Sequence, residues 1–300
     1  ATAKRLAKDL DDLRKAPLAE PYAGPAILRP RAAGVFFHEI FGHRIEGHRQ
    51  KDEDEGRTFA KKVGQAVMPA FITVIDDPTR AKHAGKELNG AYKFDDEGVE
   101  SQKVVLVDKG VLKTFLMGRS PVRNVPKSNG HGRCSPGNRP VARQGNLIVD
   151  SSQRVTYAKL REMLVEELKK QGKPYGLIFD DIAGGFTFTQ TFVPQAFKLL
   201  PLRVWKVHAD GTADQLLRGV DLVGTPLASL ERILGAGDDD DVFNGTCGAE
   251  SGWVPVSAAS PSLLVATIEV ERQRKGQDKP PLLPAPKHDP EKESDKKGTP

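Results

Sequence analysis

The sequence predicts an α+β fold, mainly antiparallel β-sheet, with one distorted metal-binding helix and one long packing helix. First, short β-branched runs are separated by turn signatures that suit hairpins. Second, few stretches have helical periodicity. Third, an apolar run at residues 35–37 leads into a His-Glu pair that a second histidine follows. With 300 residues, 38% of them hydrophobic, the chain can bury a sizeable core.

Composition divides the chain into three parts. Residues 1–28 form an N-terminal helix and connector, in which Leu6, Leu10 and Leu13 share one face of a helix that Pro17 ends. Residues 29–272 form the main domain. Residues 273–300 are rich in Pro, Lys, Glu and Asp, a composition typical of a disordered tail.

The apolar run ends in His38 and Glu39, and His43 follows five residues after the first histidine. The H-E-x-x-H helix of zinc proteases places its histidines four apart, on one face. Five residues rotate the imidazoles apart on a regular α-helix, and a π-type bulge brings them back together. The spacing therefore predicts a distorted helix of about four turns over residues 32–47. Glu39 is the candidate general base for a water bound to the metal.

Two histidines are too few for a catalytic zinc, which usually has three protein ligands. The remaining candidates are Cys247, Cys134, His131, Glu46 and His48. Cys247 is preferred because glycines flank it in an expected turn, and because a thiolate is a strong zinc ligand. Glu46 has an alternative role, orienting the imidazole of a metal-binding histidine.

From residue 67 onward the hydrophobic period changes to that of strands, and one strand is expected before the motif. The expected strands are 26–28, 71–75, 104–107, 111–117, 176–179, 186–189, 197–207, 215–223 and 263–270. Turn residues at 108–110 and 209–211 predict two hairpins. Residues 156–170 predict the long packing helix, and residues 227–234 a short one.

Charge and composition exclude several classes of protein. The net charge is +5, but eight basic and five acidic residues from Arg272 onward supply +3 of it, so the remainder predicts no nucleic-acid partner. No apolar run is long enough to span a membrane, and no signal peptide is visible. Two distant cysteines do not form a disulfide framework. A cytoplasmic location is expected.

Four separated motifs, at residues 38–47, 92–98, 129–133 and 245–256, resemble the TldD/PmbA family of metalloproteases. The resemblance runs in order from about residue 29 to about residue 270. It implies that His38, His43 and Cys247 bind Zn²⁺ and that Glu39 is the catalytic base. It also implies a zinc-binding subunit that forms a homodimer, or a heterodimer with a metal-free PmbA-like subunit. Family members carry a large N-terminal domain, of which residues 1–28 would be the remnant.

Together these features predict a zinc-dependent peptidase that cleaves unfolded peptides or small proteins, bound as an added strand at a sheet edge. The alternative is a non-enzymatic, zinc-stabilised binding or regulatory module within a protein assembly. A closed structural zinc site needs four protein ligands, and the sequence offers three good ones. A third hypothesis makes Cys247 a nucleophile with a histidine base.

Overall fold

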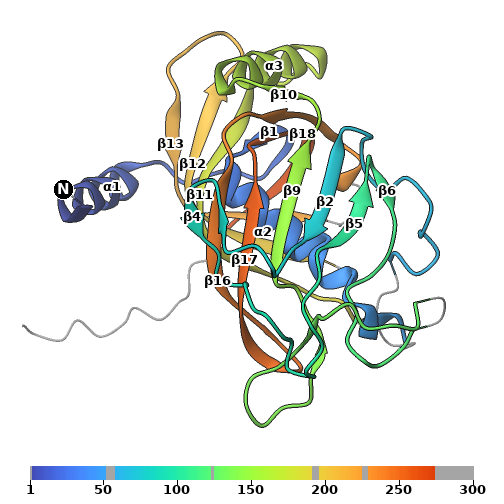
Figure 1. Cartoon of the computed structure of the whole chain (residues 1–300). Coiled ribbons are helices and arrows are strands. Elements are labelled where there is room, and N and C mark those ends of the chain that lie inside the picture. Colours follow the sequence, from blue (N-terminus) through green and yellow to red (C-terminus); the bar gives the residue numbers. More distant parts are fainter. Residues whose placement is uncertain (1, 52–57, 123–124, 191–195, 225–228, 274–300) are drawn as a thin grey trace, which may run out of the picture.

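The computed structural model describes residues 2–51, 58–122, 125–190, 196–224 and 229–273 (Figure 1). The elements in chain order are α1 (Thr2–Lys15), β1 (Tyr22–Leu28), α2 (Pro30–Ile40), η1 (Gly42–Arg44), η2 (Gly47–Gln50), β2 (Ile72–Asp76), β3 (Lys82–His83), β4 (Lys86–Glu87), β5 (Val104–Asp108), β6 (Val111–Leu112), β7 (Gly132–Arg133), β8 (Val141–Ala142), β9 (Asn146–Ser151), β10 (Arg154–Val155), α3 (Tyr157–Lys170), β11 (Tyr175–Thr187), β12 (Phe197–His208), β13 (Gln215–Leu217), β14 (Val220–Gly224), β15 (Ile233–Gly237), β16 (Asp241–Ala249), β17 (Gly252–Ser260) and β18 (Leu263–Arg272). Within these ranges, every helix is too short or too polar to cross a membrane.

The larger sheet closes on itself as a small barrel. Its strands follow the order β1-β11-β12-β14-β18, and β18 pairs back onto β1. β13 pairs with β12, and β15 and β10 continue the sheet beyond β18. α3 covers the outside of this barrel, where Leu160, Leu164 and Leu168 pack with apolar residues of β1 and β11 (Figure 1).

The second sheet has six strands in the order β16-β17-β9-β2-β5-β6. Both large sheets are mixed, because β1 runs parallel to β11, β10 to β15 and β17 to β9. The expectation of a mainly antiparallel sheet overlooked these pairs. Hairpin turns specify only antiparallel pairs of neighbours in sequence, whereas these parallel pairs join strands separated by long stretches of chain.

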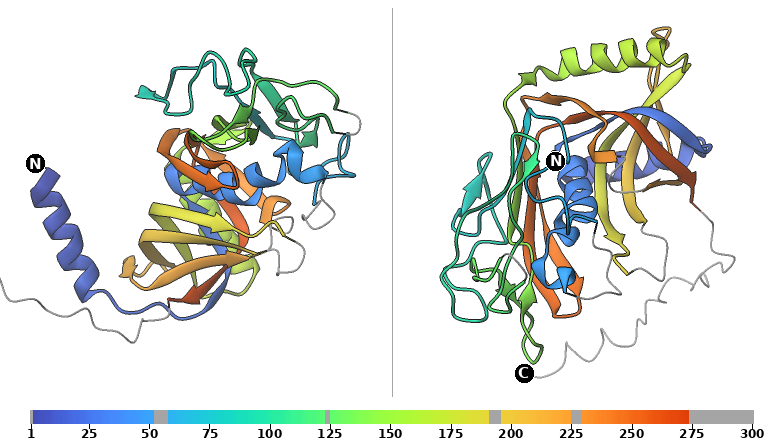
Figure 2. Two further views of the ribbon diagram at one scale, coloured as in Figure 1. Left: turned by 90° about the horizontal axis from the view of Figure 1, so that it is seen from below. Right: turned by 90° about the vertical axis from the view of Figure 1, so that its right-hand side faces the viewer.

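Helix α2 lies between the barrel and the six-stranded sheet (Figure 2). It packs against β11 and β12 on one side and against β16, β17 and β9 on the other. Every residue of α2 except Arg31 is buried. At Gly34 a Cβ atom would lie 2.7 Å from the backbone oxygen of Ala258 in β17, so glycine permits this close packing.

The predicted helix over residues 32–47 with a π-type bulge is wrong. α2 ends at Ile40, and the chain continues as the 3₁₀ turn η1. At Gly42 a Cβ atom would lie 1.9 Å from Oε1 of Gln144, so the backbone passes directly against that side chain. Gln144 also donates to the backbone oxygen of His38, in the last helical turn. The helix therefore stops, and the tighter turn carries His43 back toward His38.

Other expectations changed in the β region. The two strands expected over residues 176–189 are one long strand, β11, interrupted by register shifts. Cys247 lies inside the paired strand β16 rather than in a turn. The indole of Trp253 covers the neighbouring Gly248, where a Cβ atom would lie 2.9 Å from it. Strand β15 begins within the predicted short helix, whose first residues lie outside the described ranges.

The local turn signals correspond to observed hairpins. Lys109 and Gly110 both have positive φ, 48° and 80°, between the antiparallel strands β5 and β6. β12 and β13 pair antiparallel about the turn that contains Gly211, whose φ is 85°. The predicted disordered tail, residues 273–300, lies outside the described residues except for Gln273.

Candidate metal centre

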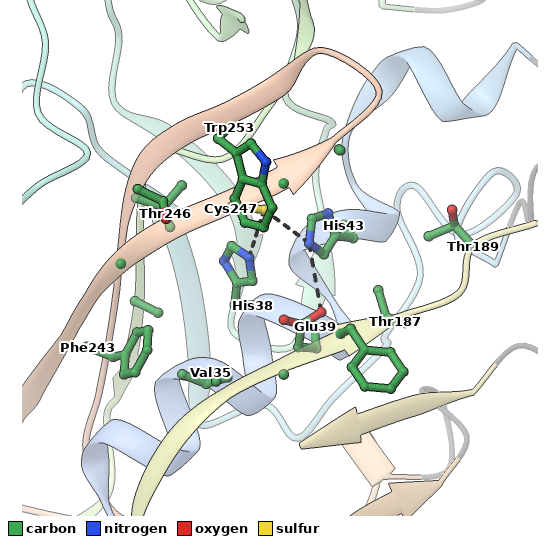
Figure 3. Close-up of a pocket in the computed structure, with 18 of the residues that line it drawn as sticks. Val35, His38, Glu39, His43, Thr187, Thr189, Phe243, Thr246, Cys247 and Trp253 are labelled. Atoms are coloured by element: carbon green, nitrogen blue, oxygen red, sulfur yellow. Dashed lines mark hydrogen bonds and ion pairs between the residues drawn. The ribbon is translucent and has the colours of Figure 1, made fainter. Parts of the chain in front are cut away.

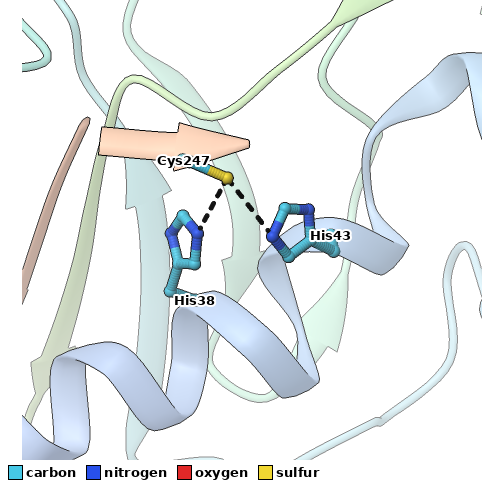
Figure 4. A group of neighbouring side chains, drawn as sticks. All are labelled: His38, His43 and Cys247. Atoms are coloured by element: carbon cyan, nitrogen blue, oxygen red, sulfur yellow. Dashed lines mark hydrogen bonds between the residues drawn. The ribbon is translucent and has the colours of Figure 1, made fainter. Parts of the chain in front are cut away.

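The structure brings His38, His43 and Cys247 together (Figure 4). The Cys247 Sγ lies 3.3 Å from Nε2 of His38 and 3.4 Å from Nε2 of His43. One ligand atom from each residue lies within 4.8 Å of the others, and all three residues are buried. Among the residues that the structure describes, this is the only such cluster of potential ligands.

Each of the three side chains comes from a different backbone setting. His38 is in the last turn of α2, His43 is in η1, and Cys247 is on the face of β16 that meets α2. The imidazole planes are 82° apart, so the two rings approach Sγ from different directions. This arrangement leaves the two Nε2 atoms and Sγ directed at one point.

A buried ionic network fixes the orientation of His43. Nδ1 of His43 lies 3.2 Å from Oε2 of Glu46, and a carboxylate can only accept, so Nδ1 carries the proton. A neutral His43 with its proton on Nδ1 would present the lone pair of Nε2 toward Cys247. Arg49 donates to the same oxygen of Glu46 at 3.0 Å. Despite burial, His43 and Arg49 hold the pKa of the Glu46 carboxyl well below its ordinary value. Glu46 thus contacts His43 through Nδ1 and is not part of the cluster of His38, His43 and Cys247.

Glu39 lies beside the cluster, with Oε2 3.8 Å from Nε2 of His43 (Figure 3). This oxygen is buried and has no hydrogen-bond partner in the described part of the chain. β11 passes close by: a Cβ atom at Gly185 would lie 3.0 Å from Cγ of Glu39. Burial raises the pKa of the Glu39 carboxyl, and the nearby His43 offsets part of that shift.

The charges of Cys247 and His43 are coupled. Burial alone would raise the pKa of the Cys247 thiol, but His43 and His38 outweigh it and hold that pKa well below its ordinary value. Burial would lower the pKa of His43, but Cys247 and Glu46 raise it well above its ordinary value. Thiolate is the form of cysteine that ligates metals, and a metal here competes with a proton for Nε2 of His43.

The donor set fits zinc. Two imidazole nitrogens and one thiolate sulfur are common zinc ligands, and three protein ligands with one open position are typical of a catalytic site. The unpartnered Oε2 of Glu39 faces the same space, where a metal or a polar group of a substrate would satisfy it.

The other three ligand candidates lie apart from this cluster. His131 is buried and contacts Asp76, with Nε2 3.2 Å from Oδ1. Cys134 is a half-buried loop residue whose backbone N–H donates to Asp96. His48 contacts the carboxylate of Glu250.

A cavity of about 850 Å³ contains the cluster and Glu39. One wall is the end of β11 and the residues after it, 183–190, and the other is β16 with the turn after it, 243–250. Three exposed aromatic side chains also line the cavity: Phe186, Phe188 and Trp253. Arg49 connects the two walls, because it donates to Thr189 on one side and to Glu250 on the other.

Arg49, Arg143 and Gln144 also belong to this site, although no sequence pattern singled them out. Arg143 and Gln144 precede the apolar strand β9 and lie about one hundred residues from both the histidines and the cysteine. In the sequence, a cation and an amide stand directly before a buried strand, where an unpaired charge would be costly. This pattern predicts that each side chain has a polar partner, but it does not identify that partner.

Comparisons with known proteins agree on one family. The family described as "PmbA/TldA metallopeptidase C-terminal domain" matches this chain over residues 21–272. A metalloprotease of Methanocaldococcus jannaschii is 32% identical over 231 residues, which cover 77% of this chain and 47% of that protein. A zinc metalloprotease TldD homologue of Saccharolobus solfataricus is 24% identical and covers 83% of this chain and 52% of its own length. The chain thus spans about half the length of these relatives.

Solved structures share the fold. TldE from Thermococcus kodakarensis superposes with a TM-score of 0.64 at 16% identity, covering 89% of this chain and 54% of that one. A putative modulator of DNA gyrase from Thermotoga maritima gives 0.62 at 21% identity, with the same coverage of each chain. The match over residues 21–272, together with the archaeal relative, shows that this chain belongs to the PmbA/TldA metallopeptidase family.

Proposed function

We propose that this chain is the catalytic part of a zinc-dependent peptidase, with His38, His43 and Cys247 as zinc ligands and Glu39 as the general base. The observation that carries the proposal is the unpartnered, buried Oε2 of Glu39 beside three convergent ligand atoms in one cavity. A structural zinc site has four protein ligands and does not need a further, unpaired carboxylate beside them. The described residues supply only three ligands.

A bound zinc supplies Lewis acidity, which polarises a scissile carbonyl and makes water a stronger acid. The residues of the chain supply the proton transfers. Oε2 of Glu39 accepts a proton from the attacking water and then delivers it to the nitrogen of the leaving amine. The raised pKa of Glu39 suits the first step, because a more basic carboxylate accepts the proton more readily.

Two strand edges beside the cluster support an extended peptide as the substrate. β16 is the outermost strand of its sheet. β11 pairs with β1 only over residues 177–179, so beyond Phe179 the described strands pair with it on the β12 side alone. A peptide backbone can pair with such edges through main-chain hydrogen bonds, so binding depends more on the extended backbone than on the peptide sequence.

The aromatic side chains of the cavity support unfolded polypeptide as the source of that peptide. Phe186, Phe188 and Trp253 are 44%, 46% and 68% exposed, and the two phenylalanine rings meet edge to face at 5.7 Å. Exposed apolar side chains that lie together mark binding surfaces more often than isolated ones do. Unfolded chains present apolar side chains that native proteins bury, so these rings favour unfolded substrates.

The test is cleavage of an unfolded protein by a Glu39→Gln variant whose zinc content is measured in parallel. We expect the parent to cleave and the variant to keep its zinc while losing about 10²- to 10⁴-fold in rate, the usual contribution of a general base. Undiminished cleavage by a zinc-loaded variant would remove Glu39 from the mechanism.

The same assay separates the alternatives. A zinc-loaded parent that binds unfolded peptides but never cleaves them would favour the non-enzymatic binding module. Cleavage that survives a chelator and stops on alkylation of Cys247 would favour the cysteine nucleophile, since that mechanism needs the thiolate and no metal.

A further inference from the structure

We propose that Arg143 and Gln144 form a positioning loop that holds the three metal ligands in their binding geometry. These two adjacent residues contact all three segments that carry a ligand. The inference rests on the proposed metal site, and it concerns how the chain places the ligands rather than what the site cleaves.

Arg143 connects Cys247 to the residue that orients His43. Its Nη2 donates to the backbone oxygen of Cys247 at 2.7 Å. Its Nε lies 3.5 Å from Oε1 of Glu46, whose other oxygen contacts Nδ1 of His43. One guanidinium therefore spans the distance between the strand that carries the thiolate and the turn that carries the second imidazole.

The remaining N–H groups of Arg143 hold the end of the β16–β17 hairpin. Nη1 donates to Oγ of Ser251 at 2.9 Å and to the backbone oxygen of Gly252 at 3.1 Å. Arg143 is fully buried, so each of these contacts replaces water. A planar guanidinium can reach several acceptors in fixed directions, which the single ammonium of lysine cannot do.

Gln144 holds the first histidine. Its Nε2 donates to the backbone oxygen of His38 at 3.3 Å, and its side chain packs directly on Gly42. Gly42 precedes His43, so the same amide lies against the backbone of both histidine segments. Gln144 thereby sets where α2 ends and where η1 begins.

Two further buried residues, Asp76 and His131, hold the loop of Arg143 and Gln144 in place. Asp76 accepts from the backbone N–H groups of Gly145 and Asn146, at 3.0 Å each. His131 contacts Asp76 through Nε2, and its backbone oxygen accepts from the N–H of Arg143 at 2.9 Å. His131 thus supports Arg143 and lies apart from the metal cluster.

This arrangement explains how ligands from distant segments meet. Partners behind metal ligands typically change metal affinity by 10- to 100-fold when they are lost. Here one loop contacts the backbone of Cys247 and of His38, and it reaches the imidazole of His43 through Glu46. We therefore expect its loss to loosen the site as a unit, and to change the shape of the coordination sphere as well as its strength.

The experiment uses the full chain with zinc and, as a spectroscopic probe, Co²⁺. We expect Arg143→Lys and Gln144→Met each to lower zinc affinity about 10- to 100-fold and to shift the Co²⁺ absorption bands. Gln144→Met keeps the side-chain length and removes only the amide, so it tests the loop if Arg143→Lys folds poorly. Affinities are measured well below the melting temperature of each variant.

Arg29→Lys is the matched control. Arg29 also joins distant segments, donating to Asp239 at 2.6 Å and lying over the ring of Tyr157, at the opposite end of α2 from His38. The Arg29→Lys substitution should lower thermal stability without changing the Co²⁺ absorption spectrum. Parental affinity and an unshifted spectrum in both loop variants would overturn the positioning role and leave the proposed peptidase intact. A parent that binds cobalt without a thiolate band would instead overturn the ligand set.

Discussion

Cys247 and Cys134 show how differently two cysteines of one chain are placed. Cys247 is 6% exposed and faces two imidazoles, while Cys134 is half-buried in a loop near Asp96. Burial raises the pKa of the Cys134 thiol, and the carboxylates of Asp96 and Glu97 raise it further. Only Cys247 is therefore in surroundings that favour a thiolate.

Cys247→Ser should lower zinc affinity by more than about 100-fold, because loss of a ligand costs more than loss of a partner behind one. Cys134→Ser should leave zinc affinity unchanged. Titration against a competing chelator measures both. Equal zinc affinity in the two variants would refute the assignment of Cys247.

Glu250 gives a residue-scale prediction about pH. Burial would raise the pKa of this carboxyl, but His48 and Arg49 lower it from 4.5 to about 2. A depressed pKa contributes stability that is present above pH 4.5 and is lost as the pH falls through about 2. Glu250→Gln should thus be less stable than the parent at pH 7, by no more than about 1 kcal/mol, since the side chain is 44% exposed.

Thermal unfolding measured from pH 7 downward tests this. The difference in melting temperature between parent and Glu250→Gln should shrink below pH 4.5. If this difference stays constant down to the lowest pH at which both chains fold, the carboxylate charge of Glu250 does not cause the difference in stability. Asp214→Asn, which removes an exposed partner of Arg161, provides a comparison remote from the cavity.

At the scale of elements, the end of α2 shows what sequence patterns can and cannot predict. The spacing of His38 and His43 shows that a regular helix cannot present both rings together, and this conclusion holds. Which distortion solves the problem depends on Gln144, about one hundred residues away, which packs on Gly42. A pattern confined to the helix contains no information about that contact, which is why the predicted π-type bulge is wrong.

The two walls of the cavity give the next prediction. Phe188→Ala and Trp253→Ala should each lower kcat/KM about 10-fold for peptides with large apolar side chains, and much less for alanine-rich peptides. Phe94→Ala is the control, because Phe94 is also exposed, at 53%, but does not line the cavity. Equal losses on both kinds of peptide would mean that the rings support the fold rather than select the substrate.

At the scale of the whole molecule, local and long-range pairings differ in how far the sequence predicts them. Turn residues such as Lys109 and Gly110 indicated a hairpin because the signal lies in the turn itself. The closure of the barrel depends on β1 pairing with both β11 and β18, which follow it by about 150 and 240 residues. Those pairings bury α2 between two sheets, and no short sequence motif predicts them.

The residues of the proposed active site are buried. His38, Glu39, His43 and Cys247 are each no more than 7% exposed, and they line a cavity between two strand edges. We therefore expect an extended segment, rather than a folded domain, to bring a peptide bond to them. Open strand edges also recruit other chains, so we propose that the active form is a homodimer, or a heterodimer with a metal-free PmbA-like subunit, that shields them.

A substrate protein should therefore be cleaved when its disulfides are reduced and it unfolds, and spared in its native state, by at least about 100-fold in rate because local opening is rare. Light scattering across a dilution series, with cleavage measured at each point, tests the assembly. Activity per chain should fall as the dimer dissociates. A monomer at every concentration that still spares native protein would show that the depth of the cavity alone accounts for the selectivity.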